Sequence, residues 1–161
     1  MKIKDVALHG ILLVLALILS YVEALLPLSF AIPGIKLGLP NIAVLFVLYR
    51  LGWKSACTVS LLRVVLSTLL FGNVMALFYS LAGALLSLTV MGLLKKSGKF
   101  SPTGVSVAGG VAHNAGQILV AMALLETAEI GYYLPVLCVS GTVAGILVGL
   151  TAALLLRRVK V

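Results

Sequence analysis

Residues 132–156 read YYLPVLCVSGTVAGILVGLTAALLL, and no charged residue interrupts them. Arg157 and Arg158 follow directly. A helix needs about twenty predominantly apolar residues to cross the hydrocarbon core of a bilayer, so this stretch is long enough to span a membrane. The sequence here predicts a transmembrane helix that ends at a basic pair.

The composition extends this prediction to the rest of the chain. Of the 161 residues, 62% are hydrophobic and 10% are charged, whereas soluble domains carry about 45–50% apolar and about 25% charged residues. Apolar residues run from Val6 to Leu156 without a long polar block that could fold by itself. We therefore expect one domain, residues 1–161, of the all-α class: a polytopic membrane protein surrounded by lipid.

Five more apolar segments lie between clusters of glycine, proline and charge. Together with the last segment they predict six transmembrane helices, at about residues 6–26, 39–51, 53–70, 73–94, 104–125 and 132–156. The second is short, and Pro40 suits its first turn. The first resembles a signal peptide, but no small-residue cleavage site and polar mature region follow it, which indicates a retained helix.

The basic residues predict the orientation of these helices. If the helices alternate in direction, ten of the twelve lysines and arginines fall on one side: Lys2, Lys4, Arg50, Lys54, Lys95, Lys96, Lys99, Arg157, Arg158 and Lys160. Basic connections face the cytoplasm, so we expect both termini in the cytoplasm. Membrane topology also explains the net charge of +8 without binding of nucleic acid.

Small residues recur at every fourth position on two of the expected helices. They are Ala16 and Ser20 in the first helix and Gly141, Gly145 and Gly149 in the sixth. Such stripes let helix backbones approach closely. Two interpretations are open: the stripes pack helices within the chain, or a stripe left on the outside of the bundle docks a partner subunit.

Arg63 lies inside the third expected helix, about 15 Å from its inner end at 1.5 Å per residue and so near the bilayer midplane. An arginine at this depth costs about 2.5–3.5 kcal/mol on translocon-based scales, so it should face a partner, a water-filled cavity or a ligand. One interpretation is a structural pairing with Glu23 or with backbone carbonyls. The other is a ligand site.

Polar residues of the fifth expected helix lie at about the depth of Arg63. They could bond other helices or line a pocket that binds a small molecule with an anionic or strongly polar group and an apolar body. With residues from the other helices and from the first outer loop, the candidate ligand-binding set is Glu23, Lys36, Asn41, Arg63, Asn73, Tyr79, His113, Asn114 and Gln117.

The sequence holds little that could catalyse a reaction. Its only acids, Asp5, Glu23, Glu126 and Glu129, are scattered along the chain. Metal-binding pairs such as CxxC and the phosphate loop GxxxxGK[ST] are absent. We therefore expect a protein that is not an enzyme, has no metal or cofactor, and depends on other subunits for any ATP hydrolysis.

Residues 32–41, IPGIKLGLPN, resemble the loop and second-helix start of S-components, the substrate-binding subunits of energy-coupling-factor vitamin transporters. Together with residues 62–63 (LR), 70–73 (LFGN) and 109–114 (GGVAHN), this segment looks like the Gx transporter family, also labelled heptaprenyl diphosphate synthase component I. The resemblance covers nearly the whole chain.

This resemblance implies a subunit in a prokaryotic cell membrane that captures a small molecule under the loop between the first two helices. The subunit would then dock a membrane scaffold protein that carries two ATPases, and Ala16 and Ser20 are the nearest match to the docking pair of the first helix in S-components. This importer subunit is our leading hypothesis.

The synthase label implies a different role. The aspartate-rich magnesium motifs of prenyl-chain elongation are missing, so the chain would be a non-catalytic accessory subunit of a prenyl diphosphate synthase. The label also suggests an isoprenoid- or quinone-related ligand. A purely structural scaffold is the third hypothesis.

Overall fold

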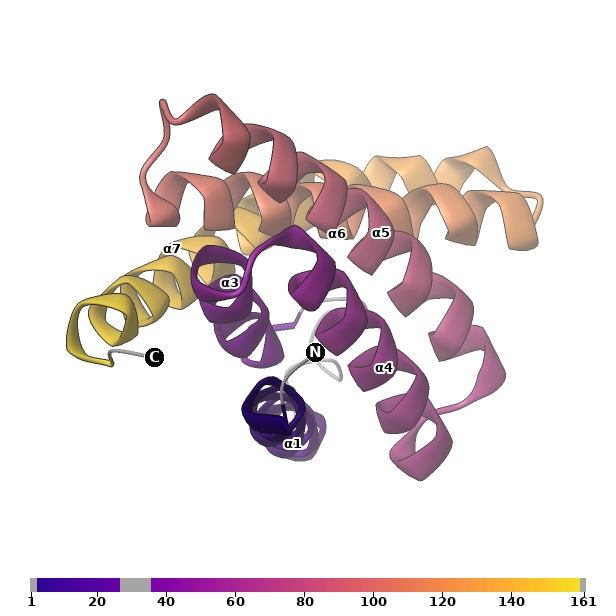
Figure 1. The fold of residues 1–161 in the computed structure, drawn as a ribbon. Helices are drawn as coiled ribbons and strands as arrows, with labels where there is room; N and C mark the ends of the chain where they lie inside the picture. Colours follow the sequence, from indigo (N-terminus) through magenta and orange to yellow (C-terminus); the bar gives the residue numbers. More distant parts are fainter. Residues whose placement is uncertain (1–2, 27–35, 160–161) are drawn as a thin grey trace.

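The computed structural model describes residues 3–26 and 36–159, and every regular element in these ranges is helical. The elements are α1 (Ile3–Leu25), α3 (Pro40–Arg50), α4 (Trp53–Phe71), α5 (Val74–Ser97), α6 (Pro102–Leu124), the 3-10 helix η1 (Ala128–Tyr133) and α7 (Leu134–Arg158). The prediction of an all-α protein is confirmed (Figure 1). Lys2, Lys160 and residues 32–35 lie outside the described residues.

Five helical segments of the described residues are long and apolar enough to cross a membrane, namely α1, α4, α5, α6 and η1 with α7. The short helix α3 has 11 residues, which span about 16 Å at 1.5 Å per residue, or about half of a 30 Å hydrocarbon core. These lengths agree with a multi-pass membrane protein in which one helix reaches only to the middle of the bilayer.

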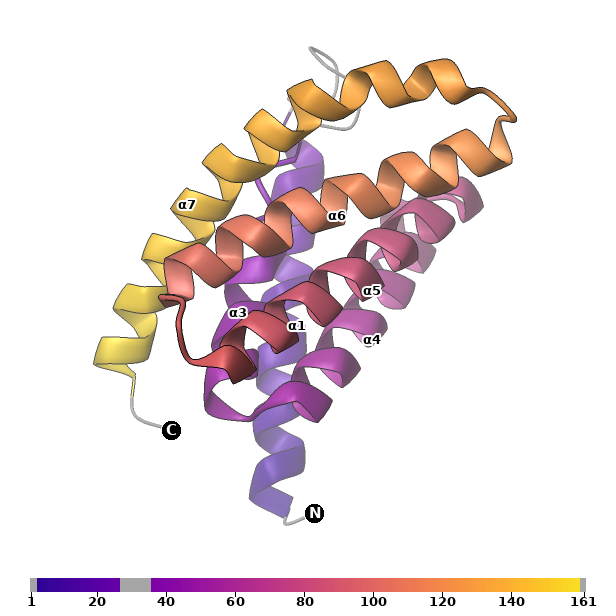
Figure 2. The ribbon, with the colours of Figure 1, turned by 90° about the horizontal axis from the view of Figure 1, so that it is seen from above.

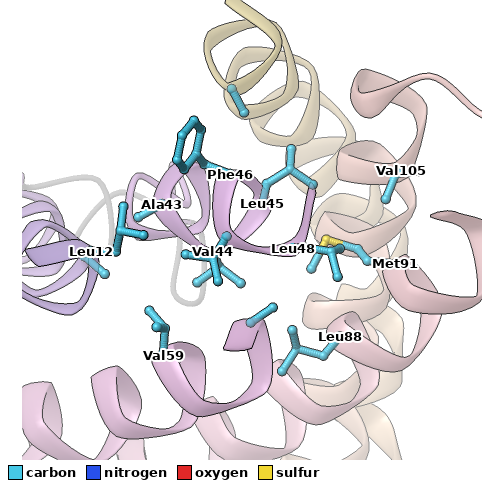
Figure 3. Close-up of a cluster of buried hydrophobic side chains, with 14 residues drawn as sticks. Leu12, Ala43, Val44, Leu45, Phe46, Leu48, Val59, Leu88, Met91 and Val105 are labelled. Carbon is cyan, nitrogen blue, oxygen red and sulfur yellow. The ribbon is translucent and has the colours of Figure 1, made fainter. Parts of the chain in front are cut away.

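The short helix α3 occupies the centre of the bundle. Its residues Ala43 to Leu48 are all buried, and a helix that is apolar on every side is one that neighbours surround. Figure 3 shows these side chains packed with residues of neighbouring helices, among them Leu12 of α1, Val59 of α4 and Leu88 of α5. Gly52, with a φ of 91°, then lets the chain turn directly into α4.

Helix α6 lies between α5 and α7 (Figure 2), and its glycines allow very close contact with α7. A Cβ atom on Gly110 would lie 2.5 Å from the Gly141 carbonyl oxygen, and one on Gly145 would lie 2.6 Å from the Val107 Cα. A Cβ atom on Gly149 would lie 2.6 Å from the Thr103 Cα. The two backbones therefore touch along the glycine stripe of α7.

Neither predicted docking stripe forms a free surface in this structure. The glycine stripe packs against α6, as described above, while Ala16 is fully buried and Ser20 is 8% exposed. The Ser20 hydroxyl donates to the Ala16 carbonyl at 2.9 Å. Of the two interpretations, packing of helices within the chain accounts for all five residues. The structure assigns no docking face to them.

Two basic residues at one end of the bundle satisfy the carbonyl groups of helix ends. The Arg50 guanidinium donates to the carbonyl oxygens of Leu156 and Val159, the second at 2.7 Å. The Lys95 ammonium donates to the Leu48 carbonyl at 2.5 Å. Cations stabilise the negative C-terminal ends of helices. Arg50 thus links α3 to the end of α7, and Lys95 links α5 to α3.

The ends of the helices divide between two sides of the bundle. In Figure 2 the beginning of α1, the end of α7 and the α5–α6 connection lie toward one side, whereas the α4–α5 connection and the η1 segment lie toward the other. This arrangement follows the alternating directions predicted from the sequence. The cytoplasmic location of the basic side remains a prediction.

Single cysteines at Lys99 and at Glu126 test this orientation, after Cys57 and Cys138 have been replaced by alanine. Because basic connections stay in the cytoplasm, Lys99→Cys should react with a membrane-impermeant maleimide only in inverted vesicles, and Glu126→Cys only in intact cells. Labelling of Lys99→Cys in intact cells would overturn the orientation.

Candidate functional site

A cavity of about 340 Å³ lies among the six main helices. Its walls extend from Leu26 and Phe71, at the ends of α1 and α4, down to Ser87 and Met91 of α5 and Ser106 of α6. Pro40, Asn41 and Leu45 of α3 also line it. The cavity therefore extends from the ends of α1 and α4 to the side of the half-length helix α3.

Seven of the nine predicted ligand-binding residues line this cavity: Glu23, Lys36, Asn41, Arg63, Asn73, His113 and Asn114. Gln117 and Tyr79 are not among the lining residues. One turn of α6 beyond His113, a Cβ atom on Gly116 would lie 2.8 Å from the Ala82 carbonyl oxygen. Helices α5 and α6 are thus in direct contact at this level, near Gln117.

Helix α5 turns a polar face to the cavity, and Tyr79 lies beside that face. The face consists of Asn73, Ala76, Ser80 and Ser87, which follow one another at three-, four- and seven-residue steps. Tyr79 precedes Ser80 by one residue, which is a rotation of about 100° around a helix of 3.6 residues per turn. The serines were absent from our predicted site, although their helical spacing is visible in the sequence.

Arg63 reaches the cavity from α4 at the level where α3 begins. Ten residues separate it from Trp53, which is about 15 Å along the helix. Its side chain is 8% exposed, and its Nε atom is buried without a hydrogen-bond partner among the described residues. A buried donor without a partner costs about 1–3 kcal/mol. This orphan N–H group is the least satisfied polar feature of the cavity wall.

Glu23 is bound to the beginning of α3. Its Oε1 atom accepts hydrogen bonds from the backbone N–H groups of Gly38 and Leu39, the second at 3.3 Å. Leu39 is the N-cap residue of α3 and provides no side-chain cap of its own. The Glu23 carboxylate binds two N–H groups just before the first helical residue and supplies the negative charge that a helix N-terminus favours.

The hypothesis of a structural pair between Arg63 and Glu23 is met only in part. Glu23 acts on Arg63 as a nearby opposite charge, but no direct ion pair within 4.0 Å joins these two side chains among those that the structure describes. The carboxylate is engaged by the start of α3 instead. The Arg63 charge is therefore neutralised only at a distance.

Lys36 lies in the segment before α3, and its side chain is accessible through the cavity. Desolvation by the surrounding protein lowers the pKa of Lys36, Glu23 opposes this shift, and the positive charge of Arg63 adds to it. An anionic group placed between the two cations would favour the charged form of Lys36. The two residues thus create a positive region at one wall of the cavity.

The two predicted site residues of α6 that line the cavity, His113 and Asn114, also have contacts with neighbouring helices. The His113 ring lies against Gly83 of α5, where an added Cβ atom would be 2.9 Å from the His113 Nε2 atom. The Asn114 Nδ2 atom donates to the Leu137 carbonyl of α7 at 2.6 Å. Both open interpretations therefore apply to Asn114, since it joins two helices and lines the cavity.

The lining as a whole suits a compact polar ligand. Hydroxyl groups come from Ser20, Ser67, Thr68, Ser80, Ser87 and Ser106, and glycines of α6 and α7 complete the lining. A volume of about 340 Å³ equals about eleven water molecules at about 30 Å³ each. Among the described residues, no group of three or more histidine, cysteine or acidic side chains could hold a metal ion.

Comparison with known families matches residues 12–155 to the family described as heptaprenyl diphosphate synthase component I. The sequence motifs indicated a resemblance to the same family. No curated protein and no solved structure matches the chain, so the likeness to S-components of energy-coupling-factor transporters stays a prediction. Since the matched region includes all but the ends of the chain, this protein belongs to the heptaprenyl diphosphate synthase component I family.

Proposed function

We propose that this protein is a non-catalytic membrane subunit that binds a small molecule with an anionic group and passes it to an importer. The observation that carries the proposal is the buried Nε atom of Arg63 in the cavity wall, which has no hydrogen-bond partner among the residues that the structure describes. A ligand carboxylate or phosphate would supply the missing acceptor, and charge-assisted bonds of this kind are about twice as strong as neutral ones.

The shape of the cavity supports uptake from outside. Its walls reach the end of α1 at Leu26 and the α4–α5 connection at Gly72 and Asn73. In the proposed orientation this is the outer side of the membrane. In this orientation the half-length helix α3 begins near the midplane and lines the cavity with Pro40, Asn41 and Leu45. Binding sites of many transporters lie at this depth beside interrupted or short helices.

The size of the cavity also bears on the ligand. A chain of seven isoprene units is far larger than a space equal to about eleven water molecules. The proposal therefore favours a compact ligand, or the polar end of a longer one, over a complete heptaprenyl chain.

Reconstitution separates binding from transport. Because the sequence holds no phosphate loop, the purified chain should retain its small molecule through purification, as detected by mass spectrometry, but should not accumulate it in vesicles supplied with ATP. Accumulation should appear only when a scaffold and ATPase subunits are added. Sustained ATP-dependent uptake by the chain alone would contradict this division of roles.

A second candidate function is favoured by the description of the family, in which the words "component I" imply another component of the synthase. In this role the chain would be a membrane accessory subunit of a prenyl diphosphate synthase. Affinity purification from native membranes distinguishes the two. Scaffold and ATPase subunits would support the importer, a soluble prenyl diphosphate synthase would support the accessory role, and neither partner nor small molecule would indicate a structural scaffold.

A further inference from the structure

A second hollow lies at the end of the bundle where α4 begins and α5 ends. It has a volume of about 410 Å³ and shares no residue with the cavity of Arg63. Its walls are Leu48, Trp53, Thr89, Gly92, Leu93, Lys95 and Lys96, and we call it the Trp53 groove. Most of its lining is apolar, and its two lysines stand at the end of α5.

One wall of the Trp53 groove depends on Gly92, which has no side chain. The indole ring of Trp53 occupies the space where a Cβ atom on Gly92 would stand, so the ring packs directly against α5 at this residue. Thr89, Leu93 and Lys96 follow at four- and three-residue steps, which places them on one exposed face of the helix. The face thus runs from Thr89 and Leu93 to an ammonium group near the end of α5.

The two lysines of the groove differ in their contacts. The Lys95 ammonium donates to the Leu48 carbonyl and lies 5.3 Å from the centre of the Tyr49 ring. Lys96 is exposed, and no hydrogen bond or ion pair found among the described residues uses its side-chain ammonium. The groove therefore ends at a cation that is available to a ligand.

We propose that the Trp53 groove binds an acidic phospholipid, with one acyl chain along Leu93 and the Trp53 ring and the phosphate group at Lys96. The groove opens on a surface that composition assigns to lipid, tryptophan prefers the interface between water and membrane, and basic pockets between transmembrane helices bind anionic headgroups. This site is independent of the ligand in the main cavity and of the orientation of the chain.

Trp53 makes the groove directly observable, since it is the only tryptophan of the chain. The purified protein is reconstituted in phosphatidylcholine vesicles that contain increasing fractions of brominated phosphatidylglycerol or brominated phosphatidylcholine. Bromine atoms on an acyl chain quench indole fluorescence only at contact. Half-maximal quenching should require a mole fraction of brominated phosphatidylglycerol about fivefold lower than that of brominated phosphatidylcholine. This ratio corresponds to about 1 kcal/mol, the attraction of one lysine to an anionic membrane surface.

Two matched variants test the role of the cation. Lys96→Gln should abolish the preference for the acidic lipid, whereas Lys99→Gln, which removes the same charge three residues away and outside the groove, should preserve it. Equal quenching of the unmodified protein by both lipids would overturn the proposal, and so would an equal effect of the two substitutions. If neither brominated lipid quenches Trp53, the proposal is also wrong, and the groove is covered by protein instead of lipid.

Discussion

Replacement of Arg63 by alanine should weaken binding of the copurified small molecule about 30-fold or more, which corresponds to about 2 kcal/mol. The guanidinium is buried in the cavity wall, and its Nε atom has no hydrogen-bond partner in the part of the chain that the structure describes. The nearest acid is engaged by the start of α3. Removal of the charge would leave the anionic group of the ligand without its main partner in a poorly hydrated site. Affinity and thermal unfolding should be measured on the same preparation.

Two further arginine variants give this experiment its controls. Arg63→Lys keeps the charge but loses the Nε donor and the planar guanidinium, so it should recover part of the affinity. Arg50→Ala removes an arginine that binds the end of α7 and should lower the unfolding temperature without a change in affinity. If Arg63→Ala destabilises the protein and leaves affinity unchanged in the folded fraction, Arg63 has only a structural role.

Replacement of Gly110 by alanine should destabilise the protein by about 1–3 kcal/mol, the usual cost of an added carbon in a closely packed interior. The new Cβ atom would lie 2.5 Å from the Gly141 carbonyl oxygen. Because this neighbour is a backbone atom, α6 and α7 would have to move apart. The free energy of unfolding in detergent, measured by denaturant titration, reports the loss.

The same substitution at Gly10 is the matched control. Gly10 lies within α1, and an added Cβ atom there would meet nothing within 4 Å. Alanine should therefore stabilise this helix by about 0.5–1 kcal/mol through its lower conformational entropy in the unfolded chain. If Gly110→Ala and Gly10→Ala change stability alike, the close contact between α6 and α7 is not what Gly110 provides.

The helical architecture was predictable because its signals are local. An apolar run of about twenty residues has few stable alternatives to a helix in lipid, where every backbone polar group must find an internal partner. The half-length helix was also visible, from Pro40 at its start and from Gly52 after its end. The predicted ends of the helices differ from the observed ones by a few residues, because terminal turns depend on capping contacts such as that of Glu23 with Gly38.

The sequence allowed us to predict how deep in the membrane the candidate site lies, but not which side chains of each helix face it. Counting residues along each helix places Arg63 and His113 at similar depths, and both line the cavity. Counting does not give the rotation of a helix relative to its neighbours. The prediction therefore included Tyr79 and Gln117, which do not line the cavity, and omitted Ser80 and Ser106, which do.

The sequence by itself determined that this chain is a bundle of membrane helices, because hydrophobicity, helix length and the placement of lysine and arginine are properties of each segment alone. Only the tertiary structure decided what the small residues and the acid do. A stripe such as Gly141 and Gly145 has the same spacing whether it meets a partner subunit or α6, and the carboxylate of Glu23 could bind Arg63 or a backbone N–H group. The choice depends on which segments pack side by side, since a contact energy exists only once two surfaces distant in sequence meet.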